Sequence, residues 1–160
     1  RRRFSVLLMA ASLGFAACGG GALAEEGGLV TFETSELAIE TARGERHRFR
    51  VEFAATHAQR AQGLMYRPSL APDAGMLFDY GRETLVAMWM KNTFIPLDIL
   101  FIAANGVIVN IAERTVPGSL ASISSAGPVR AVLEINGGAA ERLEIKPGDR
   151  VVHPIFRGER

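Results

Sequence analysis

Short apolar runs separated by turn residues follow one another along the chain, and this spacing limits the folds that it can adopt. Residues 37–41 and 48–53 alternate between apolar and polar side chains, which is typical of two half-buried strands in an antiparallel hairpin. Residues 97–102 and 107–111 are rich in β-branched side chains and are joined by an Asn-Gly pair, a strong signal for a hairpin turn. Repeated short strands of this kind indicate an all-β sandwich or barrel.

The remaining pattern supports the same fold class. Thr56 and Gln59 fit the capping box of a helix start and Gly63 fits a helix end, so we predict a short helix over residues 56–62. Residues 116–129 are rich in serine, glycine and proline and predict a long surface loop. Further strands are expected at residues 76–78, 85–90, 131–135 and 151–152.

Residues 85–90 are apolar on both sides of the predicted strand, so we expect this strand to be buried on both faces. Taken together, the elements predict a mainly all-β, small β-barrel-like domain of about seven short strands with one short helix.

The first 24 residues differ from the rest of the chain. Three arginines precede an apolar run that is too short to span a bilayer comfortably, and small residues in an A-x-A pattern follow, ending at Ala24. We therefore predict a signal peptide over residues 1–24, a flexible lead-in over 25–36 and a folded domain over 37–160, in a periplasmic or secreted protein. Residues 15–18 also loosely resemble a bacterial lipobox. The alternative is thus a lipoprotein anchored to the membrane only through Cys18.

Charge and cysteine content limit the partners of the folded domain. Without the three N-terminal arginines, 15 basic residues face 17 acidic ones, so the net charge is −2 instead of +1. A domain near neutrality has no electrostatic footprint for nucleic acid, and we expect no nucleic-acid partner. Cys18 is the only cysteine, so the folded part offers neither a disulfide framework nor a thiolate metal site.

The stretch over residues 84–102 is the main candidate for a functional site. It holds the only tryptophan, Trp89, and then a polar triplet, Lys91, Asn92 and Thr93, which is set between two apolar runs. Asp98 follows within the next predicted strand. Sites where the apolar pattern of a fold is broken are often functional, so we expect this stretch to carry the function.

Several short motifs occur in a fixed order along the chain: Gly63-Leu64-Met65 with Arg67, Gly75-Met76-Leu77-Phe78, Trp89-Met90-Lys91-Asn92-Thr93, Ile95-Pro96-Leu97-Asp98-Ile99, Leu133-Glu134 and Gly148-Asp149. Together they resemble a known family, DUF192, which is also called UPF0127. The resemblance covers roughly residues 37–152, and its most specific piece is the run from Trp89 to Ile99. It implies a compact β-barrel-like domain, often secreted, and no established biochemical activity.

Two interpretations of the polar residues in this stretch remain open. The polar constellation that both interpretations concern also includes Arg60 and Glu134. In the first, Trp89, Lys91 and Asn92 line a concave patch for a small polar ligand or a peptide end, with Trp89 as the platform and Lys91 as the charge. In the second, they form an internal ion pair or an Asn92 network that fixes the bend at Pro96, because buried polar groups are usually satisfied. The candidate ligand-binding residues are Trp89, Lys91, Asn92, Thr93, Asp98 and Arg67.

A soft-metal site is an alternative function. Thioethers select Cu(I) and histidine is a general transition-metal ligand, so Met65, Met76, Met88 and Met90 with His57 are candidate ligands. Their spacing defines no ligand set, and methionine also fills irregular gaps in small cores. We therefore assign no metal site.

A hydrolase is the second alternative, because a catalytic triad assembles in space and not in sequence. Ser122 or Ser124 with one of the three histidines would be its candidate residues, but no serine lies in a G-x-S-x-G elbow. We therefore assign no catalytic residue. We predict a non-enzymatic protein that binds a small polar ligand or a protein partner through the region from Trp89 to Asp98.

Overall fold

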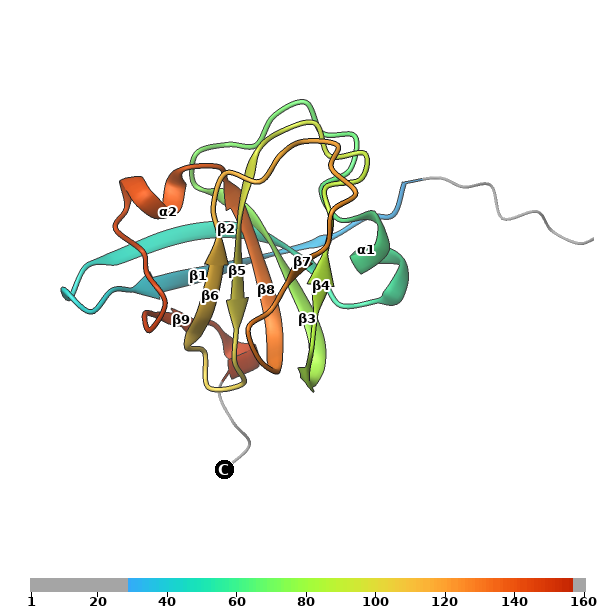
Figure 1. The fold of residues 1–160 in the computed structure, drawn as a ribbon. Helices are drawn as coiled ribbons and strands as arrows, with labels where there is room; N and C mark the ends of the chain where they lie inside the picture. Colours follow the sequence, from blue (N-terminus) through green and yellow to red (C-terminus); the bar gives the residue numbers. More distant parts are fainter. Residues whose placement is uncertain (1–28, 157–160) are drawn as a thin grey trace, which may run out of the picture.

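The computed structural model describes residues 29–156, which fold mainly into strands (Figure 1). The predicted signal peptide and Cys18 lie outside these residues. The strands are β1 (Glu33–Glu40), β2 (Arg46–Ala54), β3 (Ala74–Thr84), β4 (Ala87–Met88), β5 (Leu97–Ile102), β6 (Ile108–Ala112), β7 (Ile123–Ser124), β8 (Val129–Asn136) and β9 (Arg150–Val152). The helical elements are α1 (His57–Gln62), α2 (Ala139–Arg142) and the 3-10 turn η1 (Pro154–Phe156). Within residues 29–156, no helix has the length and apolar character needed to cross a membrane.

Seven strands form one sheet in the order β6-β5-β8-β3-β2-β1-β9. Its two edges approach each other, because Val107 forms a bridge with Arg150 and the amide of Val151 donates to the carbonyl of Gly106. The sheet is thereby a nearly closed barrel, and the predicted mainly all-β, barrel-like fold is confirmed. β4 and β7 pair only with each other in a separate two-stranded sheet.

The hairpins and the helix lie where the sequence predicts them. β1 and β2 pair antiparallel, although β1 begins at Glu33, before the predicted start of the strand. β5 and β6 pair across the Asn-Gly turn, where Gly106 has a φ of 83° that favours glycine. α1 has a complete capping box, in which the Thr56 side chain accepts from the Gln59 amide and Gln59 accepts from the Thr56 amide.

The prediction that residues 85–90 form a strand buried on both faces is wrong. β4 contains only Ala87 and Met88, and Leu85 and Trp89 are 72% and 50% exposed. The reason is that β4 lies over the barrel and has a core on one side only. The predicted loop over 116–129 contains β7, whose pairing with β4 is too distant in sequence to leave a local signal.

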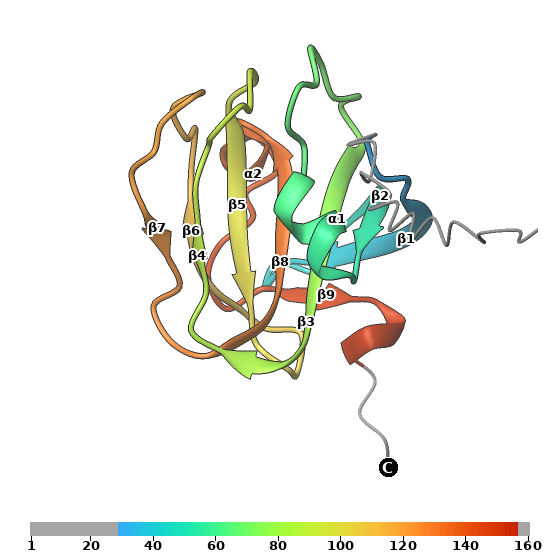
Figure 2. The same ribbon diagram turned by 90° about the vertical axis from the view of Figure 1, so that its right-hand side faces the viewer.

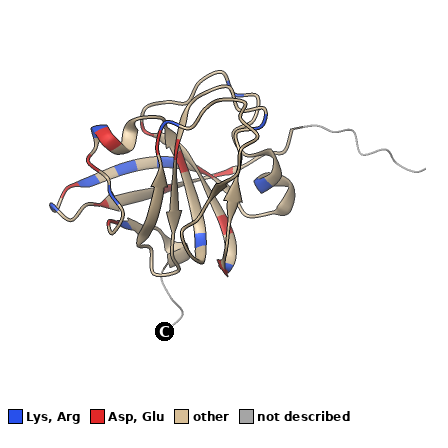
Figure 3. Cartoon of the chain, in the orientation of Figure 1, with Lys and Arg blue, Asp and Glu red and all other residues tan. Residues whose placement is uncertain are grey.

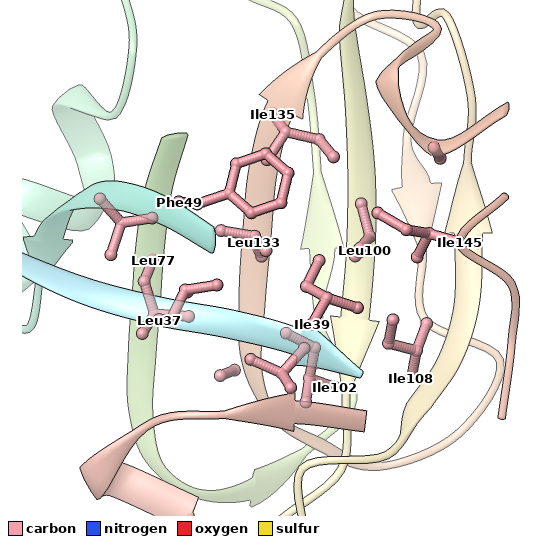
Figure 4. Close-up of a cluster of buried hydrophobic side chains, with 14 of the residues drawn as sticks. Leu37, Ile39, Phe49, Leu77, Leu100, Ile102, Ile108, Leu133, Ile135 and Ile145 are labelled. Carbon is pink, nitrogen blue, oxygen red and sulfur yellow. The ribbon is translucent and has the colours of Figure 1, made fainter. Parts of the chain in front are cut away.

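Two cores lie on opposite faces of the barrel sheet. The inner core contains Leu37, Phe49, Leu100 and Leu133 among others (Figure 4). The outer core includes Leu64, Phe78, Val86, Met90 and Val132. In β8 the alternation of a strand directs Ala131, Leu133 and Ile135 to the inner core and Val132 to the outer one. The next outward-facing position of β8 is Glu134, a charged residue on an apolar face.

Candidate functional site

A cavity of about 110 Å³ lies beside the outer core, between α1, β3, β4 and β8. Figure 2 faces this side of the molecule, where α1 and β4 lie in front of the sheet. Its lining combines apolar groups with titratable side chains from three elements, namely Arg60 of α1, Tyr80 of β3 and Glu134 of β8. A cavity of this volume has room for a small ligand.

Glu134 forms the buried acidic wall of the cavity. Its register places it opposite Met76 of β3, and the residue is only 4% exposed. Within residues 29–156 its carboxyl group has neither a hydrogen-bond partner nor a salt bridge. Burial raises the pKa of Glu134 from its ordinary 4.5 to about 8, so the carboxyl group is mostly protonated at neutral pH while the cavity holds no cation. A buried acid of this kind at a cavity is a candidate ligand-binding group.

Tyr80 and Arg60 form the neighbouring wall. The Tyr80 hydroxyl donates to Sδ of Met88 at 3.4 Å, and the Arg60 guanidinium carbon lies 5.2 Å from the centre of the Tyr80 ring. Burial raises the pKa of Tyr80 to about 12; the nearby Arg60 lowers this pKa and Glu134 raises it. The Tyr80 hydroxyl is thus neutral and lies near the side chains of Arg60 and Glu134.

Two of the predicted site residues, Trp89 and Thr93, line this cavity. Lys91 is exposed, and its ammonium nitrogen lies 5.1 Å from the centre of the Trp89 ring, within cation–π range. The Asn92 side chain donates to the Tyr66 hydroxyl at 2.8 Å, and its backbone φ of 55° is one that asparagine tolerates. The structure therefore brings Trp89 and Thr93 to the cavity, and it places Lys91 and Asn92 at the surface next to it.

Asp98 lies away from the cavity, on the inner face of the sheet near α2. Its Oδ1 accepts from the amides of Arg114 at 2.7 Å and Gly138 at 2.9 Å, and its Oδ2 accepts from the amide of Ala140 at 2.8 Å. Three backbone donors satisfy a carboxylate and cap the start of α2. Asp98 is therefore a structural residue that ties three segments together.

Arg67 also has a partner of its own. Its two guanidinium nitrogens donate to the two carboxylate oxygens of Glu52, at 2.6 and 2.5 Å. This fork joins the turn after α1 to β2 and uses the bidentate geometry of arginine. Arg67 does not line the cavity.

The methionines do not gather as a copper site would require. Met65 and Met88 line the cavity, whereas Met76 and Met90 are fully buried, and Sδ of Met90 accepts a hydrogen bond from Thr115. His57 is exposed at the start of α1 and does not line the cavity. Within residues 29–156 there is no group of three or more His, Cys, Asp or Glu side chains that could hold a metal ion.

The candidate hydrolase residues are also apart. The hydroxyls of Ser122 and Ser124 lie 3.4 Å from each other, and no histidine is bonded to either in the part of the chain that the structure describes. His153 does contact Ser35, at 2.7 Å through Nε2. Nδ1 of His153 accepts from the amide of Ile155 at 3.4 Å, and Ser35 is not one of the candidate serines.

Sequence reasoning named Glu134 and Arg60 only as neighbours of the candidate site, and it missed Tyr80. The local signal for Glu134 was present, because a charged residue interrupts the apolar alternation of the strand at 131–135. No such signal exists for Tyr80 or Arg60. They reach the cavity because β2 and β3 pair in parallel across α1, a long-range arrangement.

A larger open hollow of about 310 Å³ lies along β1, β2 and β9, but its charged residues, such as Arg48 and Glu36, are exposed to solvent. Figure 3 shows acidic and basic residues near one another on the long β1/β2 pair. The Glu134 cavity is the stronger candidate site, because its carboxyl group is buried and has no hydrogen-bond partner within residues 29–156.

Fold and cavity together define a small barrel-like domain with a ligand-sized pocket on its outer face. A family model for DUF192, described as "Uncharacterized ACR", matches residues 38–153, so the chain belongs to this family and the predicted membership is confirmed.

Solved structures agree with this assignment. The chain is 50% identical, with a TM-score of 0.76, to a protein of Sinorhizobium meliloti 1021 described as a candidate transcription regulator; the match covers 78% of this chain and 97% of the other. It is 43% identical, with a TM-score of 0.74, to a protein of unknown function from Novosphingobium aromaticivorans DSM 12444; that match covers 76% of this chain and 86% of the other. No curated protein matches.

Proposed function

We propose that this chain is a binding protein that holds a small polar molecule in the cavity beside Trp89. The observation that carries the proposal is Glu134, a buried carboxyl group that lines the cavity and has no hydrogen-bond partner within residues 29–156. Among the described residues, the one fully enclosed side-chain polar atom without a hydrogen-bond partner is Nε2 of His47, so the Glu134 oxygens are open to the cavity, where a ligand can reach them. A ligand that hydrogen-bonds to Glu134 would satisfy it.

The position of Trp89 supports the same proposal. Ala87, Met88 and Trp89 line the Glu134 cavity and also a second, open hollow of about 300 Å³ that includes Leu120. Apolar walls with a few convergent polar groups are typical of small-molecule sites. The ligand thus fits between an acidic wall at Glu134 and an apolar wall at Met88.

Thermal unfolding of the purified protein with a panel of amines, amino acids, carboxylates, amides and sugars tests the proposal. A ligand at a hundredfold excess over its Kd stabilises the native state by about 2.7 kcal/mol, which raises the midpoint. We expect at least one compound to raise the midpoint in the wild type, and a smaller rise in Glu134→Gln. Glu113→Gln, an exposed glutamate outside the cavity, is the matched control. No rise with any compound would refute the proposal for this size of ligand.

A protein partner is a second candidate, favoured by exposed apolar side chains in neighbouring loops. Trp89, Phe94, Val116 and Leu120 are all at least half exposed, and Gly118 bonds to the turn at Thr93, which brings these loops together. Exposed aromatic clusters mark interaction sites more often than scattered apolar residues do. A photo-crosslinking residue placed at position 120 should capture one defined partner, whereas the same residue at position 43 should not. Equal capture at both positions would argue against this candidate.

We also propose that the protein acts outside the cytoplasm, and the basic, apolar and small-residue segments of residues 1–24 support this. Mass spectrometry of the protein from cells should find Glu25 as the mature N-terminus, or Cys18 if the lipobox alternative is correct. An uncleaved N-terminus would contradict both.

A further inference from the structure

The Glu134 cavity carries an acid and a base that do not pair with each other. Arg60 and Glu134 both line it, yet no salt bridge joins them. Among residues 29–156, Arg60 has no carboxylate partner, and Glu134 has no partner at all. A basic and an acidic side chain that line one small cavity without contacting each other leave room for a molecule between them.

The Arg60 side chain is oriented by the backbone. Its Nη1 donates to the carbonyls of Ala55 and Asp79, the latter at 3.0 Å, and its guanidinium lies against the Tyr80 ring. These contacts occupy one of its three nitrogens. Within residues 29–156, Nε and Nη2 of Arg60 donate to no other group, so they can form the bidentate pair with a carboxylate that arginine favours.

Glu134 offers the opposite chemistry. As a carboxylate it would accept hydrogen bonds from an ammonium group, and the attraction is strong because the site is desolvated. Strand β4 also borders the cavity, and one of its two edges has no partner strand among the described residues. Since Ser125 donates its amide to the Val86 carbonyl, the backbone groups of the next residue, Ala87, point away from β7. Ala87 also lines the cavity.

We propose that the ligand is a small zwitterion of the α-amino acid class, whose ammonium group binds Glu134 and whose carboxylate binds Arg60. This inference rests on the proposed binding function of the same cavity. The cavity is small, about 110 Å³, so glycine and alanine, the smallest amino acids, are the first ligands to test. A cation alone would satisfy Glu134 but would be repelled by Arg60, and an anion alone would leave the buried acid without a partner.

Isothermal titration calorimetry with four molecules of nearly equal size tests this assignment. Alanine carries both charges, alaninamide only the positive one, propionate only the negative one, and propionamide neither. We expect alanine to bind at least tenfold more tightly than each of the other three. Glu134→Gln should weaken alanine binding at least tenfold and leave propionate unchanged. Arg60→Gln should weaken alanine binding at least tenfold and leave alaninamide unchanged.

Arg82→Gln, which removes an exposed arginine outside the cavity, is the matched control and should bind alanine as the wild type does. Circular dichroism at the titration temperature checks that each variant is folded. If alaninamide or propionamide binds as tightly as alanine and Arg60→Gln has no effect, the zwitterion assignment is overturned while the small-ligand function stands. If none of the four binds and the panel also gives no thermal shift, the proposed function itself fails.

Discussion

The buried Glu134 predicts an unusual dependence of stability on pH. Its pKa is raised in the folded protein to about 8, whereas an unfolded glutamate titrates near 4.5. Between these two values the folded state keeps a proton that the unfolded state has released. The free energy of unfolding therefore falls as the pH rises through this window, and above about pH 8 the loss is complete.

The Glu134→Gln substitution isolates this effect, because glutamine resembles the protonated acid and does not ionise. Each pKa unit corresponds to about 1.4 kcal/mol, so the rise from 4.5 to about 8 corresponds to roughly 5 kcal/mol. The stability of the variant minus that of the wild type should be near zero close to pH 4.5 and should increase to as much as about 5 kcal/mol above pH 8. Contributions of other groups, including His153, cancel in this difference.

Urea-induced unfolding, followed by far-ultraviolet circular dichroism at pH 5, 7 and 9, measures the difference directly. Glu113→Gln serves as the control, and its stability relative to the wild type should stay constant over the same range. A difference for Glu134→Gln that does not change between pH 5 and pH 9 would refute the reasoning, since it would mean that Glu134 titrates normally in the folded protein.

Three further substitutions test the structural roles of named residues, each by urea-induced unfolding at pH 7. Asp98→Ala leaves three backbone amides without their acceptor and should cost about 3–5 kcal/mol; a loss below about 1 kcal/mol would be inconsistent with the network. Thr56→Ala removes the helix cap and should cost about 1 kcal/mol, so an unchanged stability would show that α1 does not depend on it. Gly75→Ala would place a methyl group 2.6 Å from the Glu134 carbonyl oxygen and should cost about 1–3 kcal/mol, and a neutral result would contradict this close approach of β3 and β8.

The sequence predicts most of the barrel because its signals are local. The alternation at residues 48–53, the capping box at Thr56 and the Asn-Gly turn at residue 106 each depend on neighbours a few positions apart. The burial of residues 85–90 was predicted wrongly, because it depends on contacts with residues that are distant in the sequence. An apolar run does not show whether both of its faces will pack against a core. The side chains of Leu85 and Trp89 lie on a face that is exposed to solvent.

The candidate site was predictable only in part. Trp89 and Thr93 line the cavity, but Asp98, which has the same kind of sequence signal, binds backbone amides elsewhere. A polar residue in an apolar strand indicates that a partner is needed and does not identify it. For Asp98 the partners are the amide of Arg114 and two amides at the start of α2, and for Glu134 no described residue supplies one.

Tryptophan fluorescence during a titration with the same panel of small polar compounds tests the central claim most directly. Trp89 is the only tryptophan of the sequence and lines the cavity, so the signal reports on the site itself. Our account predicts a saturable change with at least one compound in the wild type and a much weaker response in Glu134→Gln. A signal that stays flat with every compound, or that changes equally in both proteins, would contradict the claim that this cavity binds a small polar ligand through Glu134.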